Sequence, residues 1–497
     1  MRTQAKPFAA TTLALALCSM TFGADAREDP ALRARIEQSC KRFLDFYAGL
    51  QRDGGWACLY HHPTLWAFAA GERHLLKSPG TVDFAKGGFT ASKVMGMYLP
   101  AYEVFRDARY LDAARGSGDV LVKGQCPNGV LQAHYFTFPD GRVEPMREGN
   151  SIEMPGDEGP APAVIMLVWI ARLTDDAKYR QAAIRCAELY IRAQHPNGSW
   201  AQKFNLRTGQ PGGLGYGVLN DGATTEPMNI MLLMYHMTQD AKFLAPVVKA
   251  GDWFVRAQNR QGGIPGWAEQ YDHQDRPCWA RSFEPPAICA GSTGQATRAL
   301  LNMYRLTRDE KYLAPLRFLA TWVREHPREK WGHYTDPKTA EPIHAANRKI
   351  IPGGNATALR TSGWVKEAAH PAYDPKRIER LIRDTIRDVQ NPPTPPPIEQ
   401  QRKGWRQIFW TQAPAFEQAI ATQNAQGYWV GEGAWKDRAM QCVSCVTYRD
   451  VPRMLKALHL LAGAEGRVPP YAVGTSRWIR RAWPVADWFD TPLRRGK

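Results

Sequence analysis

The stretch Leu173-Thr174-Asp175-Asp176-Ala177-Lys178-Tyr179 decides the fold, because close copies of it stand on both sides along the chain. The copies are Phe105-Arg106-Asp107-Ala108-Arg109-Tyr110, Met237-Thr238-Gln239-Asp240-Ala241-Lys242-Phe243 and Leu306-Thr307-Arg308-Asp309-Glu310-Lys311-Tyr312. The closing aromatic residues follow one another at intervals of 69, 64 and 69 residues. Such a period indicates a repeated supersecondary unit that buries its apolar face by stacking on its neighbours.

Each copy is interpreted as a short polar turn between two helices. The stretches Pro227–Met237 and Ala241–Ala257 carry apolar residues at three- and four-residue steps, which is typical of helices. Glycine-rich turns alternate with the copies: Asp53-Gly54-Gly55-Trp56, Pro127-Asn128-Gly129, Pro196-Asn197-Gly198-Ser199-Trp200 and Gln261-Gly262-Gly263-Ile264. Stacked hairpins form either an open solenoid or a toroid of inner and outer helices, and these turns favour the toroid. We therefore predict an all-α fold, an incomplete or full α/α toroid, with irregular loops and short strands lining a cleft.

The predicted organisation has four parts. Residues 1–26 form a signal peptide, residues 27–390 the toroid domain, residues 391–397 a proline-rich linker or arm, and residues 398–497 a C-terminal helical segment packed on the toroid. In the first part Arg2 and Lys6 precede the apolar run Phe8–Phe22, and Ala24-Asp25-Ala26 provides a small-residue cleavage site. Because this run is too short to span a bilayer, we expect a secreted or periplasmic protein without stable membrane insertion.

The charge of the chain narrows the class of partner. The formal net charge is +16 and the pI is near 9.4, which fits nucleic acid, an anionic membrane or an acidic glycan. Export disfavours nucleic acid, so we expect an acidic polysaccharide as the partner. We also expect the protein to be a monomer.

Eight cysteines remain after cleavage, and their pairing cannot be deduced from their spacing. Within the lone Cys-x-x-Cys at Cys442 and Cys445, a local disulfide or packed thiols is favoured over a redox site.

The register of the repeats singles out two acidic residues. Tyr179 and Phe243 lie 64 residues apart, and so do Asp157 and Asp221. Both acids precede a predicted inner helix, so neighbouring repeats would present them at the same mouth. Asp is also a common helix N-cap, and capping is therefore the alternative role for each of them.

Cleavage of a polyuronate by β-elimination needs a base for the proton at C5 and positive charge beside the substrate carboxylate. Asp221 and Asp272 are candidate ligands for Ca²⁺, which takes oxygen ligands. Arg281 and Arg348 are candidate contacts of the uronate carboxylate, because guanidinium groups bind carboxylates with two hydrogen bonds. The alternative roles are an ion pair of Arg281 with Glu284 and a turn cap for Asp272.

Three segments in this part of the chain resemble family 10 pectate lyases. Leu219-Asn220-Asp221-Gly222-Ala223-Thr224-Thr225 is similar to the family's DGAT segment, and Gln270-Tyr271-Asp272 with Ala280-Arg281-Ser282-Phe283-Glu284-Pro285-Pro286 to its QxD…ARxFEPP segment. The stretch from Tyr334 to Arg348 is similar to a later segment that ends in arginine. The chain departs from the family after Arg348, where Lys349-Ile350 replaces Asp-Gly, and this is the mark of a divergent member.

The resemblance implies an α/α toroid that cleaves polygalacturonate by Ca²⁺-assisted β-elimination. It implies that Asp221 binds Ca²⁺ and the substrate carboxylate, that Asp272 assists it, and that Arg348 is the catalytic base. Further substrate contacts are expected from Arg281, Asp157, Trp267, Tyr271 and Thr224.

Two other functions stay open from the residues alone. One is a toroid glycoside hydrolase acting on uronyl oligosaccharides, in which Asp157 and Asp221 would be the paired acids with a water between them. The other is a non-catalytic glycan-binding protein. The function that we expect is that of a secreted polysaccharide lyase acting on a pectate-like polyuronate.

Overall fold

The computed structural model describes residues 28–468, apart from residues 57–58, 66, 69–79, 85–89, 133, 146–150, 154–159, 206, 213–214, 329–330, 353–370, 392–395, 436–437 and 444–446. The predicted signal peptide, Asp157, Cys445 and most of the proline-rich linker therefore lie outside the described residues. Cys40, Cys126, Cys186, Cys278 and Cys289 are free thiols. Among the helices in the described part, none is long and apolar enough to cross a membrane.

Helices dominate the fold and short strands connect them. The α-helices are α1 (Pro30–Ala48), α2 (Thr90–Lys93), α3 (Leu99–Phe105), α4 (Ala108–Gly124), α5 (Pro160–Thr174), α6 (Ala177–Ala193), α7 (Thr225–Thr238), α8 (Leu244–Arg256), α9 (Ala290–Thr307), α10 (Ala314–Glu325), α11 (Pro375–Gln390), α12 (Ile398–Ala421) and α13 (Thr447–Ala464). The π-helix η1 (Val94–Tyr98) joins α2 to α3, and the 3-10 turn η2 (Asn220–Gly222) precedes α7.

In the described part of the chain, the strands form six small antiparallel sheets. They are β1 (Leu59–Tyr60) with β2 (Ala67–Phe68); β3 (Gly80–Asp83), β4 (His134–Thr137) and β5 (Val143–Pro145); β6 (Ser151–Glu153), β7 (Lys203–Asn205) and β8 (Pro211–Gly212); β9 (Gly217–Val218) with β10 (Gln270–Tyr271); β11 (Ile288–Cys289), β12 (Tyr334–Thr335), β13 (Pro342–Ala346) and β14 (Lys349–Pro352); and β15 (Val430–Trp435) with β16 (Arg438–Val443).

The repeated polar turns have one local geometry. In each, one residue adopts a left-handed conformation, with φ between 53° and 64° at Arg106, Asp175, Gln239 and Arg308. The aspartate that follows accepts a hydrogen bond from the backbone N–H two residues on, which caps the next helical segment. The closing aromatic residue is buried against the preceding unit; the hydroxyl of Tyr179, for example, lies 2.8 Å from Oδ1 of Asp119 in α4. The turn therefore ends one helix, starts the next and fastens two units together.

The glycine-rich turns repeat in the same way. Gln125, Gln194 and Gln258 each donate to two backbone carbonyls, one in their own turn and one in the next unit. Gln423, which follows α12, makes the same pair of bonds, to the carbonyls of Gly427 and of Ser39 in α1. The C-terminal hairpin of α12 and α13 is thus another unit of the repeat, placed next to α1.

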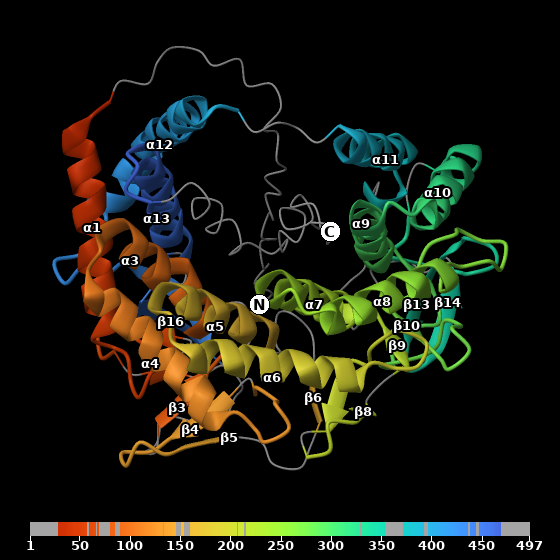
Figure 1. The fold of residues 1–497 in the computed structure, drawn as a ribbon, viewed down its shortest axis with the longest axis horizontal. Coiled ribbons are helices and arrows are strands. Elements are labelled where there is room, and N and C mark those ends of the chain that lie inside the picture. The colour runs from red at the N-terminus through yellow and green to blue at the C-terminus, as the bar shows by residue number, and fades with distance from the viewer. Residues whose placement is uncertain are drawn as a thin grey trace, which may run out of the picture.

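The units follow one another around a ring (Figure 1). Helix α12 contacts α1, α13 contacts α3, and contacts then continue in chain order through α9 to α11. In Figure 1, α5, α9 and α13 lie nearer the centre of the ring than α6, α10 and α1. The prediction of an α/α toroid with short strands in its loops is confirmed.

Candidate active site

Asp221 lies in a loop held at the start of an inner helix. It belongs to η2, directly before α7, and adopts a left-handed conformation with φ of 52°. The backbone N–H groups of Leu219 and Asn220 donate to the carbonyl of Glu269, at 2.7 and 3.3 Å, which ties this loop to the loop before β10. The Asp221 side chain is exposed, and its Oδ2 accepts a hydrogen bond from Gln202 at 3.2 Å. The carboxylate is therefore presented to solvent by a defined backbone turn.

The second segment docks beside Asp221 through Glu284. Only 3 % of Glu284 is exposed, and its Oε1 accepts from Asn220 Nδ2 at 3.2 Å and from Arg281 Nε at 2.7 Å. The hydrogen bonds to Glu284 raise the pKa of Arg281, with smaller contributions from the charges of Asp221 and Glu269. The predicted alternative for Arg281, an ion pair with Glu284, is present. Its side chain is nevertheless 46 % exposed, so it can contact a ligand as well.

Arg348 reaches the same loop from another element. It stands at the tip of the β13–β14 hairpin, where Asn347 and Arg348 form a two-residue turn with φ of 50° and 58°. Two positive φ angles at such a turn define type I′. The backbone N–H of Arg348 donates to Ser282 at 2.8 Å, and its Nη2 donates to the carbonyl of Ala280 at 2.9 Å. The structure thus brings Asp221, Arg281 and Arg348, from three distant segments, into one region.

A fourth residue of this region, Glu269, was not predicted as a site residue. Burial raises the pKa of its carboxyl to about 7; the Tyr334 hydroxyl opposes this shift, and the charges of Glu284 and Asp221 add to it. Its Oε2 accepts from Tyr334 at 2.6 Å, and its Oε1 lies 3.4 Å from Cys289 Sγ. The signal in the sequence was position: Glu269 comes two residues after Trp267, as Gln202 comes two residues after Trp200.

Asp272 has a local role that corrects its assignment as a calcium ligand beside Asp221. Its Oδ1 accepts from the backbone N–H groups of Gln274 and Arg276, and its Oδ2 pairs with the Arg276 side chain at 2.8 Å. Burial alone would raise the pKa of Asp272, but the hydrogen bonds from Arg276 and Gln274 outweigh it and hold the pKa below its usual range. Both oxygens therefore serve the turn after β10, which is the capping role left open from the sequence.

Three predicted substrate contacts are core residues instead. Thr224, Trp267 and Tyr271 are at most 1 % exposed. Thr224 accepts from the backbone of Trp200, as Thr90 does from Trp56 and Thr293 from Trp267, so this bond belongs to the repeat. The Tyr271 hydroxyl accepts from Ala268, three residues earlier, as that of Tyr135 accepts from Gln132. Because these side chains build the repeat, the expectation that they face a ligand is wrong. Asp157 lies outside the described residues.

Residues 163–326 match the family model of pectic acid lyases. This part is about a third of the chain, and the match is consistent with a divergent relative of that family. The match covers Asp221, Glu269, Arg281 and Glu284 but ends before Arg348. It confirms the family predicted from the motifs, and with it a lyase enzyme that acts on polysaccharide. No curated protein matches the chain.

Several solved structures are similar to this chain at low sequence identity. A mutant of the family 10 polysaccharide lyase from Cellvibrio cellulosa, in complex with trigalacturonic acid, is 15 % identical over 60 % of this chain and 98 % of its own, with a TM-score of 0.42. An unsaturated glucuronyl hydrolase specific for heparin is 10 % identical over 88 % and 98 %, with a TM-score of 0.39. A family 76 glycoside hydrolase (mannosidase) from Bacteroides thetaiotaomicron is 11 % identical over 88 % and 99 %, with a TM-score of 0.41. Since each score is below 0.5, the assignment rests on the family match.

Proposed function

We propose that this lyase cleaves a polyuronate, with polygalacturonate as the first candidate, by Ca²⁺-assisted β-elimination. The observation that carries the proposal is the convergence of an exposed carboxylate, Asp221, with two guanidinium groups, Arg281 and Arg348, from separate loops. An acidic sugar brings its own carboxylate, and this mixture of charges suits binding it directly and through a cation. We also propose that the enzyme is secreted or periplasmic, as residues 1–26 predict.

Each of these groups would have a separate role in the elimination. The C5–H bond breaks, its electron pair forms the C4–C5 double bond, and the C4 oxygen leaves with the electrons of its bond and takes up a proton. Arg281, oriented by Glu284, would pair with the uronate carboxylate and stabilise the charge that develops next to C5. Arg348 would accept the C5 proton, the role that the resemblance implies for it.

The Asp221 region fits a hard cation. Ca²⁺ prefers oxygen ligands, and the region offers the Asp221 carboxylate with the Gln202 amide beside it. Glu284 adds negative charge close by, because it accepts a hydrogen bond from Asn220, the residue next to Asp221. When bound, Ca²⁺ would neutralise the substrate carboxylate and so acidify the neighbouring C5 proton.

The test is the ultraviolet absorbance of unsaturated uronate products, measured with the mature protein on polygalacturonate, with Ca²⁺ and with chelator. We expect a Ca²⁺-dependent rise that Asp221→Ala abolishes. Asp272→Asn is the matched control, because the structure ties that carboxylate to Arg276, and it should keep most of the activity. If no polyuronate of a panel gives the absorbance, the lyase proposal fails.

The hydrolase alternative gives a different result in the same assay. It would release saturated sugars without the absorbing double bond and would not depend on Ca²⁺. A protein that binds oligouronates but forms no product would be the non-catalytic alternative.

A further inference from the structure

Beside the proposed substrate site, three side chains of different chemistry point at one spot. Cys289 Sγ lies 3.4 Å from Glu269 Oε1 and 3.8 Å from His333 Nε2, and His333 Nε2 lies 3.9 Å from Glu269 Oε1. Within the described part of the chain, these are the residues whose potential ligand atoms gather closely enough to hold a metal ion as a group of three. The three contacts form a nearly equilateral triangle.

That triangle has the dimensions of a tetrahedral zinc site. Zinc bonds of about 2.3 Å to sulfur and about 2.0–2.2 Å to nitrogen or oxygen place neighbouring ligand atoms roughly 3.3–3.6 Å apart. The observed separations exceed this by about half an ångström at most, which side-chain rotation can close. A nucleophile relay would be arranged differently, with the carboxylate on the far ring nitrogen of the histidine. Here Glu269 lies against the sulfur and the same nitrogen that faces it.

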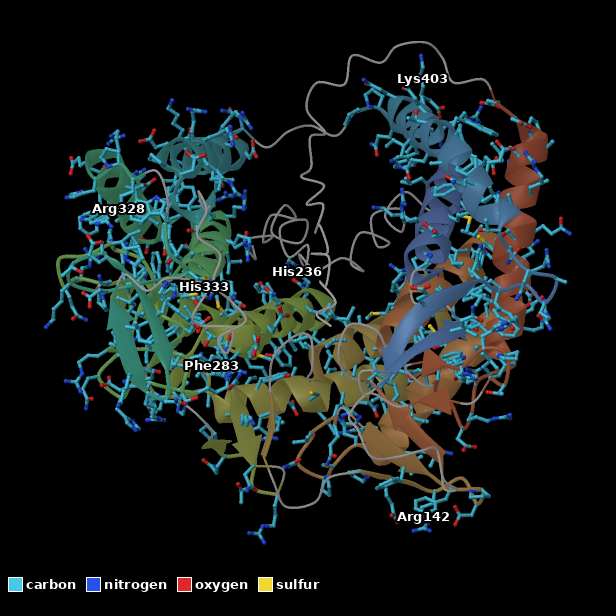
Figure 2. All side chains as sticks on the ribbon, turned by 180° about the vertical axis from the view of Figure 1, so that it is seen from behind. Arg142, His236, Phe283, Arg328, His333 and Lys403 are labelled. Atoms are coloured by element: carbon cyan, nitrogen blue, oxygen red, sulfur yellow. The ribbon has the colours of Figure 1, made fainter. Side chains whose placement is uncertain are left out.

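The fold fixes the three residues from separate elements. Cys289 ends β11 and is the N-cap residue of α9. Its backbone N–H donates to the carbonyl of Trp267 at 2.9 Å, which places the loop carrying Glu269 beside it. His333 directly precedes β12, and its carbonyl accepts from Ala290 at 3.1 Å. Figure 2 labels His333 together with Phe283, the neighbour of Arg281, in the same part of the ring. These connections are backbone bonds of core segments, so the triangle is pre-formed.

Groups around the triangle support ligation. The Tyr334 hydroxyl donates to Glu269 Oε2 at 2.6 Å, which leaves Oε1 directed at the sulfur. Cys289 is 1 % exposed. The side chains of His333 and Glu269 keep 24 % and 11 % exposure, so one side of the triangle is open.

We propose that Glu269, Cys289 and His333 bind one zinc-class ion, with three protein ligands and a fourth position open toward the Asp221 region. A thiolate and an imidazole select such an ion over Ca²⁺, which takes oxygen ligands alone. Three protein ligands with one open position are the arrangement of a catalytic rather than a closed structural zinc site. The fourth ligand would be water or an oxygen of the bound sugar. The site is distinct from the proposed Ca²⁺ site at Asp221 and does not depend on it.

The experiment titrates the chelator-treated, reduced full chain with Co²⁺, which reports a thiolate ligand by a charge-transfer absorption band. We expect one equivalent of Co²⁺ to produce this band, Zn²⁺ to remove it, and excess Ca²⁺ to leave it unchanged. Cys289→Ser and His333→Gln should each abolish the band. Cys186→Ser is the matched control, because Cys186 is another fully buried free thiol, on α6, and that variant should keep the band.

Tyr334→Phe provides a milder variant, because it keeps all three ligands and removes the bond to Glu269. It should weaken Co²⁺ binding about 10- to 100-fold, as loss of an outer partner does at metal sites. Absence of a stoichiometric band in the folded wild type, or a band that survives in both Cys289→Ser and His333→Gln, would overturn the proposal. Since Asp221→Ala should keep the band, failure of the lyase assay and failure of this site are separate results.

Discussion

His195 links one glycine-rich turn to the pH dependence of stability. It is 8 % exposed, its ring stacks on Tyr216 at 3.8 Å between centroids, and burial together with the charge of His273 lowers its pKa to about 4. A lowered pKa means that the folded protein resists protonation while the unfolded chain takes up a proton below about pH 6.5. The stability that this residue contributes is therefore present above pH 6.5 and is lost as the pH falls through about 4.

We expect His195→Gln to reduce the loss of stability between pH 6.5 and pH 4 by up to about 3 kcal/mol, since each pKa unit corresponds to about 1.4 kcal/mol. Denaturant unfolding of both proteins at pH 7, 5.5 and 4 measures this difference. His326→Gln is the control, because that side chain is exposed. Parallel pH profiles for wild type and His195→Gln would contradict the prediction.

At the same scale, the sequence predicted the exposure of the charged candidates better than that of the aromatic ones. Asp221, Arg281 and Arg348 lie in exposed loops in one region of the structure. These charges stand out in the sequence because the repeat does not require a charge at their positions. Trp267 and Tyr271 belong to the same motifs. The hydrogen bonds of their side chains to the backbone recur at Trp200 and Tyr135, in other units of the repeat. Comparing the repeats would have identified them as core residues. The cluster of Cys289 and His333 could not be predicted, because only strand pairing joins residues 44 positions apart.

At the scale of elements, the turn of the β13–β14 hairpin contains the proposed catalytic base, Arg348. Arg348 occupies a left-handed position that glycine adopts without strain, and its side chain makes one bond, to Ala280, among the contacts described. Arg348→Gly should therefore leave stability within about 1 kcal/mol of wild type. It should lower kcat by about 10²- to 10⁴-fold if Arg348 is the base.

Steady-state rates and thermal unfolding of the same preparation measure both effects. Asn347→Gly changes the other left-handed position of the turn and should alter neither. Full activity of Arg348→Gly on a confirmed polyuronate substrate would assign the proton transfer to another group.

In several glycine-rich turns the glycine packs on the backbone of a helix in the next unit. A Cβ on Gly198 would lie 2.3 Å from the carbonyl oxygen of Lys249 in α8, and its φ is 101°. Gly129 meets Arg185 at 2.4 Å, and Gly427 meets Arg42 of α1 at 2.8 Å, in the same way. Gly198→Ala should therefore destabilise the protein by at least about 1–3 kcal/mol, the cost of a strained backbone position, with the steric clash in addition.

Gly212→Ala is the matched control, because nothing lies within 4 Å of a Cβ there and its φ is not positive. Denaturant unfolding should separate the two variants clearly. Equal stabilities would show that the turn relaxes and that this contact does not set the spacing of the units.

The repeated turns explain why the sequence predicted the hairpins correctly as far as α10. Each polar turn contains its own N-cap and left-handed residue, so its structure is determined locally. The assignment of α12 and α13 to the ring could not be read locally, although Gln423 and Gly427 match their counterparts in the earlier turns. It depends on contacts with α1, which lies more than 380 residues earlier in the chain.

At the scale of the whole molecule, a buried polar group fastens the C-terminal hairpin to the rest of the ring. Glu103 in α3 is 3 % exposed; its Oε2 bonds His459 Nε2 in α13 at 2.9 Å, and its Oε1 bonds Arg172 Nη2 in α5 at 2.7 Å. His459 is fully buried. One carboxylate thus connects three inner helices that are far apart in the sequence.

Removing that carboxylate should weaken the junction of α3 with α5 and with the C-terminal hairpin. Glu103→Ala leaves the Arg172 charge and the His459 ring without their shared partner, and loss of one member of a buried ion pair costs roughly 3–5 kcal/mol. Because Arg172 is 34 % exposed and can turn toward water, we expect the lower end of this range. Glu399→Ala is the control, since its pair with Arg402 lies on the surface, where such pairs contribute about 0–1 kcal/mol.

Hydrogen exchange measures which helices lose stability in Glu103→Ala. If the carboxylate joins the C-terminal hairpin to the ring, α13 and α3 should lose protection together in Glu103→Ala while α9 and α10, on the far side of the ring in Figure 1, lose less. Loss confined to α3 would instead mean that α13 is held by its apolar contacts alone. A uniform loss in all helices would mean that the ring unfolds as a single cooperative unit, with no weaker boundary at the place where the last hairpin meets the first.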